Sequence, residues 1–156
     1  MRILLLGSAL SLAFSLFTTP LFIRLFAKIG WGQFIRQDGP KTHFVKRGTP
    51  TMGGIVIILA IVFGYFGAHL IERAPISLSA LLVIGLIVGL GLVGFLDDYS
   101  KIRHQQSLGL SPRGKLIGQI VVAVLFGVAA VSFPDANGQT PAAQGISLVR
   151  NADVLS

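Results

Sequence analysis

Cysteine is absent from the 156 residues, so the chain has neither a disulfide framework nor a thiol for catalysis. Charge is also scarce, because Asp, Glu, Lys and Arg together make up 12% of the residues while 53% are hydrophobic. The mean hydropathy is +0.77. A soluble domain of this size needs far more charge on its surface. We therefore expect an integral membrane protein.

Acidic residues are scarcer than basic residues. Six Asp and Glu stand against 13 Lys and Arg, which gives a net charge of +7. Such an excess suits nucleic-acid binding, but the basic cytoplasmic loops of a multi-pass membrane protein produce the same sum. Long uncharged apolar runs favour the second interpretation. We expect contact with a lipid bilayer and none with nucleic acid.

Four apolar runs are long enough to cross a bilayer, which takes about 20 helical residues. The first run follows Arg2 and resembles a secretory signal peptide, but no small-residue cleavage site follows it and its apolar character continues. The sequence predicts an all-α fold of multi-pass transmembrane helices, forming one domain over residues 1–156. The expected spans are approximately 3–26, 52–71, 76–96 and 116–133, with polar loops at 27–51 and 97–115.

The distribution of Lys and Arg predicts the orientation of these spans. Arg2, Arg73 and Arg150 fall on one side of the expected bilayer. Cytoplasmic loops are enriched in basic residues, so the other side, which holds all the remaining Lys and Arg, is predicted to be cytoplasmic. Both polar loops then share that face. Its basic residues are Arg24, Lys28, Arg36, Lys41, Lys46, Arg47, Lys101, Arg103, Arg113 and Lys115.

Asp97 and Asp98 directly follow the third apolar run. Negative charge at a helix C-terminus is opposed by the helix dipole, by about 0.3–1 kcal/mol for each charge, which favours a site over a simple solvated helix end. Adjacent carboxylates repel unless a divalent cation or an ammonium group lies between them, and Mg²⁺ is the natural cation. If the helix continues, Lys101 falls on the same face at i+4 and i+3. We predict a functional pair that binds Mg²⁺.

The polar loop before the second run has the side chains that bind phosphate oxygens, namely Lys41, His43, Lys46 and Thr51. The alternative is an ordinary basic loop, but the surrounding Gly and Pro residues favour a binding loop. Lys101 and Lys115, taken singly, are ordinary interfacial lysines. Gly85 and Gly89 predict a helix-packing face, and His69 predicts a polar contact between helices.

Three motifs together resemble one enzyme family. Residues 38–54 read DGPKTHFVKRGTPTMGG, residues 94–101 read GFLDDYSK, and residues 109–115 read GLSPRGK. In this order, with an apolar hairpin between the first two, they resemble the phospho-N-acetylmuramoyl-pentapeptide transferases of the polyprenyl-phosphate N-acetylhexosamine-1-phosphate transferase superfamily. The resemblance implies transfer of phospho-MurNAc-pentapeptide from UDP to undecaprenyl phosphate, giving lipid I and UMP in peptidoglycan synthesis. It also implies Mg²⁺ and the cytoplasmic face of the bacterial plasma membrane.

The resemblance also assigns roles by position. Asp97 corresponds to the family's base or nucleophile toward the lipid phosphate, and Asp98 to its acidic partner near the metal. Both are expected metal ligands. The implied partners are UDP-MurNAc-pentapeptide, undecaprenyl phosphate and the bilayer, and a homodimer stays open. The substrate-binding set is Lys41, His43, Lys46, Thr51, Lys101 and Lys115.

The chain departs from the family in length. Family members are about twice as long, with about ten spans, a third catalytic aspartate and a His-rich loop that this sequence lacks. We expect the chain to correspond to the N-terminal part of such an enzyme and to be incomplete by itself. Two alternatives stay open: a non-catalytic membrane module that binds polyprenyl phosphate, and a small cation-handling membrane protein that uses Asp97 and Asp98.

Overall fold

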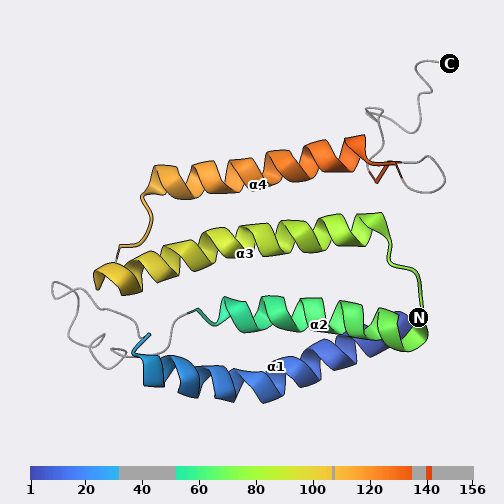
Figure 1. The fold of residues 1–156 in the computed structure, drawn as a ribbon, viewed down its shortest axis with the longest axis horizontal. Coiled ribbons are helices and arrows are strands. Elements are labelled where there is room, and N and C mark those ends of the chain that lie inside the picture. Colours follow the sequence, from blue (N-terminus) through green and yellow to red (C-terminus); the bar gives the residue numbers. More distant parts are fainter. Residues whose placement is uncertain (32–51, 107, 135–139, 142–156) are drawn as a thin grey trace.

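A computed structural model describes residues 1–31, 52–106, 108–134 and 140–141 of the chain. This part consists of helices and connections without strands, which confirms the all-α prediction. All four helices are long and apolar enough to cross a membrane. They are α1 (Arg2–Ile29), α2 (Gly54–Glu72), α3 (Leu78–His104) and α4 (Pro112–Ser132), and Figure 1 shows them side by side.

Local sequence sets where these helices begin and end. Ser77 precedes α3 and its Oγ accepts a hydrogen bond from the Ala80 N–H at 3.3 Å, whereas Ser111 caps α4 through the Gly114 N–H at 3.1 Å. A capping hydroxyl satisfies a backbone donor that has no partner within the helix. Helix α1 ends at Ile29 and is followed by Gly30, whose φ of 81° is left-handed and suits glycine.

The chain alternates direction, so that two sets of helix ends lie at opposite ends of the molecule (Figure 1). The C-terminal ends of α1 and α3 lie at the same end as the N-terminal ends of α2 and α4. Trp31 and Met52, which flank residues 32–51, therefore lie at the same end of the molecule as Asp97. This arrangement agrees with the prediction that both polar segments share one face.

Small residues bring α1 and α2 into close contact. Ser11 Oγ donates a hydrogen bond to the Ala60 carbonyl at 2.8 Å, across the two helices. A Cβ added at Gly64 would lie 2.6 Å from the Gly7 carbonyl oxygen, so only glycine fits there. In lipid, close backbone approach and interhelical hydrogen bonds are the main sources of helix association. The α1–α2 pair is therefore the most tightly packed part of the described fold.

The predicted loop at 97–115 is wrong over most of its length. Helix α3 continues to His104, so Asp97, Asp98 and Lys101 are helical, and α4 begins at Pro112. The sequence interpretation ended the helix at the first charges. The helix continues because Lys101 neutralises both carboxylates one turn later, and because Lys101, Arg103 and His104 in the last turn favour the helix dipole.

The predicted packing face on α3 is correct at one of its two glycines. A Cβ at Gly89 would lie 2.8 Å from Val122 on α4, so this glycine admits the neighbouring helix. A Cβ at Gly85 would meet nothing within 4 Å. The small-residue spacing predicted contact along the whole stripe, but α4 approaches α3 closely only over part of it.

Candidate functional site

Asp97 lies near the C-terminal end of α3 and is buried, with 8% of its surface exposed. It is the one buried charged residue in the part of the chain that the structure describes. Burial of a carboxylate is costly unless it is paired and hydrogen-bonded. The contacts around Asp97 therefore define the site.

Lys101 joins the two aspartates. Its Nζ lies 2.7 Å from Asp97 Oδ2 and 2.7 Å from Asp98 Oδ1. These are the i+4 and i+3 contacts that a continuous helix predicts, because residues three and four apart lie on one helical face. The conditional prediction for Lys101 is confirmed, and the group between the carboxylates is an ammonium.

A second set of contacts comes from the α3–α4 connection. The Leu110 N–H donates to Asp97 Oδ1 at 2.8 Å, and Lys115 Nζ lies 2.9 Å from the same oxygen. Lys115 lies in the first turn of α4, which Ser111 and Pro112 begin. Hydrogen bonds in which one partner is charged are about twice as strong as neutral ones. Asp97 is thus fixed by donors from both α3 and α4.

The two carboxylates differ in how many of their oxygens are contacted and in how exposed they are. Both oxygens of Asp97 accept contacts, whereas Asp98 is contacted by the described residues only through Oδ1. The Asp98 side chain is 32% exposed, against 11% for Asp97. Two carboxylates and two ammonium groups leave this cluster electrically balanced. Each ammonium has three N–H donors, so Lys101 and Lys115 could each bind a phosphate oxygen while keeping these carboxylate contacts.

Aromatic rings connect the end of α1 to the site. Trp31 stacks on Phe26 with ring centroids 5.5 Å apart, and meets Tyr99 edge-to-face at 6.2 Å. Tyr99 in turn stacks on Phe95 at 6.0 Å. Tyr99 directly follows Asp98, so Trp31 lies beside the turn of α3 that carries the aspartates. The sequence interpretation did not use these rings, although Trp and Tyr at helix ends are a known interfacial signal.

The structure brings together four of the predicted site residues, namely Asp97, Asp98, Lys101 and Lys115. Among the described residues there is no group of three or more His, Asp or Glu side chains that could hold a metal ion. The sequence did not predict that the Leu110 amide and Gly109 contact Asp97, because a backbone group is the same whatever the residue type. The predictions for Lys41, His43, Lys46 and Thr51 lie outside the described residues.

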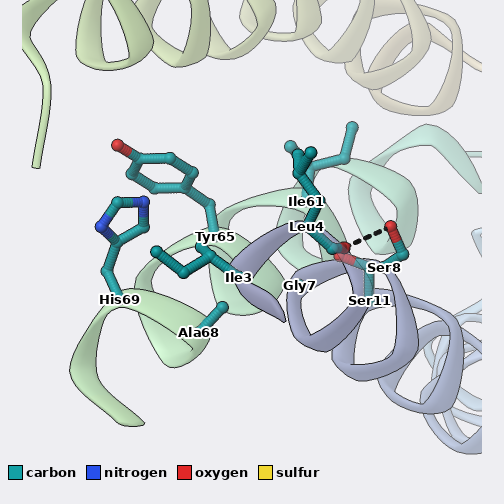
Figure 2. A pocket seen from close by; sticks show the side chains of 9 residues that line it. All are labelled: Ile3, Leu4, Gly7, Ser8, Ser11, Ile61, Tyr65, Ala68 and His69. Carbon is teal, nitrogen blue, oxygen red and sulfur yellow. Dashed lines mark hydrogen bonds between the residues drawn. The ribbon is translucent and has the colours of Figure 1, made fainter. Parts of the chain in front are cut away.

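A separate cavity of about 360 Å³ lies between α1 and α2 at the opposite end (Figure 2). The rings of Tyr65 and His69 lie there with centroids 4.4 Å apart, tilted by 41°, and His69 Nδ1 lies 3.3 Å from the Ala74 carbonyl oxygen. The predicted polar contact of His69 is therefore with the α2–α3 connection rather than with another helix. Because this cavity is at the other end of the helices, it belongs to a different site from the aspartates.

Comparison with known proteins adds a second line of evidence. A family model described as phospho-N-acetylmuramoyl-pentapeptide-transferase signature 1 matches residues 46–58. A curated relative from Clavibacter michiganensis subsp. michiganensis is 58% identical over 154 residues, covering 95% of this chain and 42% of the relative. The relative from Kineococcus radiotolerans is 53% identical (97% of this chain, 42% of the relative), and that from Cutibacterium acnes is 50% identical (99% and 44%).

All three relatives carry the name phospho-N-acetylmuramoyl-pentapeptide-transferase. The chain spans less than half the length of these curated relatives. No solved structure matches it significantly.

Proposed function

The chain belongs to the phospho-N-acetylmuramoyl-pentapeptide-transferase family, and from this premise we propose that the natural gene product carrying it makes lipid I. The reaction transfers phospho-MurNAc-pentapeptide from UDP to undecaprenyl phosphate and releases UMP. The observation that supports this most directly is the buried Asp97 carboxylate, held between two lysines beside a second carboxylate.

The proposed chemistry is a displacement at phosphorus. An oxygen of the lipid phosphate bonds to the sugar-linked phosphorus of the donor, the bond from this phosphorus to the bridging oxygen breaks, and UMP leaves with that oxygen. Asp97 serves either as the base that accepts the proton of the lipid phosphate or as a nucleophile toward the donor. Lys101 and Lys115 neutralise the diphosphate, because ammonium groups stabilise charge that develops on phosphate oxygens.

A Mg²⁺ ion is part of the proposal. Mg²⁺ prefers one or two carboxylates together with substrate phosphates, and the adjacent aspartates are that donor type. Asp98 is the first choice as ligand because its Oδ2 receives no contact from the described residues, and Asp97 is the second. When bound, the ion would neutralise negative charge on the donor diphosphate. We further assign Lys41, His43, Lys46 and Thr51 to substrate binding, and a homodimer stays a prediction.

The location proposed is the bacterial plasma membrane, with the aspartates at the cytoplasmic face. Four helices suited to crossing a membrane support it, together with the basic residues near the aspartate end. Lys28, Lys101, Arg103 and Lys115 all belong to helix ends at that end of the molecule.

A UMP-release assay tests the proposed function. We expect the natural gene product to release UMP from UDP-MurNAc-pentapeptide only when undecaprenyl phosphate and Mg²⁺ are both present. Asp97→Asn keeps the size of the side chain but removes its charge, and should lower turnover by about 10²-fold or more while the protein still reaches the membrane. Normal turnover by this variant would remove Asp97 from the mechanism.

The same assay separates the enzyme from the alternative of a binding module. A binding module would bind undecaprenyl phosphate without releasing UMP, whereas the natural gene product of a transferase gene should do both. Absence of UMP release from the natural gene product, with lipid binding retained, would refute the proposed transferase.

A further inference from the structure

Gly109 lies against Asp97 more closely than any side chain would allow. A Cβ built on Gly109 would lie 2.7 Å from Asp97 Cγ, and closer still to Asp97 Oδ1 and to the Asp97 backbone oxygen. Real Cβ atoms essentially never come this close to other heavy atoms. Gly109 does not have the left-handed φ that favours glycine. The requirement for glycine here comes from space and not from backbone conformation.

Other glycines near the site do not share this property. A Cβ at Gly118 would meet Val93 methyl groups at 3.1 and 3.2 Å, and a Cβ at Gly114 would lie 3.2 Å from Ser111 Oγ. Those neighbours are side-chain atoms, which shift at little cost. At Gly109 one neighbour is the backbone of α3, which an added methyl group could displace only by moving the connection away from the helix.

The close approach has a direct consequence for the carboxylate. Leu110 follows Gly109, and its N–H reaches Asp97 Oδ1 at 2.8 Å. Lys115, a few residues later in α4, contacts the same oxygen. If residue 109 moved outward, the Leu110 amide would move with it, and Oδ1 would lose the donor that is fixed in the backbone.

We propose that Gly109 is a positioning residue, whose missing side chain seats the α3–α4 connection on Asp97 and so fixes the orientation of that carboxylate. Any effect of Gly109 on catalytic turnover rests on the proposed transferase function, whereas the contact between Gly109 and Asp97 does not. In this proposal Gly109 acts through the Leu110 amide rather than by binding a substrate.

Amide exchange of this chain in detergent micelles, followed by NMR, tests the contact without any activity. We expect the Leu110 amide to exchange at least about tenfold more slowly than an unprotected amide, as a hydrogen bond to a charged group implies. Gly109→Ala should remove that protection. Gly85→Ala is the matched control, because a Cβ there meets nothing within 4 Å, and it should leave Leu110 exchange within about twofold.

An unprotected Leu110 amide in the unaltered chain, or full protection in Gly109→Ala, would overturn the proposal. If Gly109→Ala does not fold, Asp97→Ala removes the acceptor instead and should accelerate Leu110 exchange by the same factor. Unchanged exchange in Asp97→Ala would overturn the proposal equally.

Kinetics of the natural gene product test the positioning role. Gly109→Ala should lower kcat by about tenfold or more and leave the KM for UDP-MurNAc-pentapeptide within about twofold, since it misplaces a group needed in the transition state. Gly85→Ala should change neither value. Unchanged kcat in Gly109→Ala, with an active unaltered enzyme, refutes positioning and leaves the transferase assignment intact. An inactive unaltered enzyme refutes the transferase function, and the exchange experiment still decides the contact.

Discussion

Asp97 and Asp98 are neighbours in the chain but are held in different ways. Three donors fix both oxygens of Asp97, whereas Asp98 depends on Lys101 alone among the described residues. Asp97 is buried and Asp98 is partly exposed. This difference assigns the positioned, reacting carboxylate to Asp97 and the accessible, cation-binding carboxylate to Asp98 within the proposed function.

At this residue scale, we predict that Lys101→Ala lowers the free energy of unfolding of this chain by about 1.5–3 kcal/mol, because two adjacent carboxylates lose their shared ammonium group. Equilibrium unfolding in detergent measures the loss. Arg103→Ala is the control, since Arg103 lies exposed in the same helical turn and should change stability by less than about 0.5 kcal/mol. Equal effects of the two substitutions would contradict the bridging role of Lys101.

At the scale of elements, the helices differ in how closely they pack. Helices α1 and α2 meet through Gly7, Ser11, Ala60 and Gly64, with backbone against backbone. On α3, Gly89 admits Val122 of α4, whereas Gly85 meets nothing. The same small-residue spacing therefore has different outcomes, depending on whether a neighbouring helix lies against it.

We accordingly predict that Gly64→Val separates α1 from α2 and destabilises the chain by about 1–3 kcal/mol, as overpacking of a close contact does. Thermal unfolding in micelles measures this change. Gly85→Val adds the same atoms where a Cβ would meet nothing within 4 Å, and should be nearly neutral. A Gly64→Val chain as stable as the unaltered one would contradict the close α1–α2 interface.

At the scale of the whole molecule, alternating helix directions place one set of ends, with the aspartates, opposite the α2–α3 connection (Figure 1). Because the sequence contains no cysteine, single introduced cysteines report on each end without background. Gln106 lies just beyond α3 at the aspartate end, and Glu72 ends α2 at the other, and both are exposed.

We predict that a membrane-impermeant maleimide labels Glu72→Cys from outside intact cells freed of their outer barriers. Gln106→Cys should be labelled only after the membrane is opened, because the basic end of the molecule faces the cytoplasm. Neither substitution alters the number of Lys and Arg residues, so neither should disturb orientation. Labelling of Gln106→Cys from outside would contradict the proposed cytoplasmic site.

The sequence alone determined that the chain is helical and suited to a membrane, because four apolar runs of sufficient length are separated by polar segments. It also determined that Lys101 can bridge Asp97 and Asp98, since helical periodicity places the three on one face. It could not determine that the helix continues through these charges, because the cost of two carboxylates near a helix end depends on whether a lysine is close enough to neutralise them.

Only the tertiary structure decided which distant groups complete the site. Lys115 and the Leu110 amide reach Asp97 because the α3–α4 connection folds back onto α3, and Trp31 reaches Tyr99 because α1 ends beside it. No periodicity within a single helix reports a contact between helices or a contact made by a backbone amide. For the same reason the sequence could not distinguish Gly109, where a side chain has no room, from Gly85, where it has.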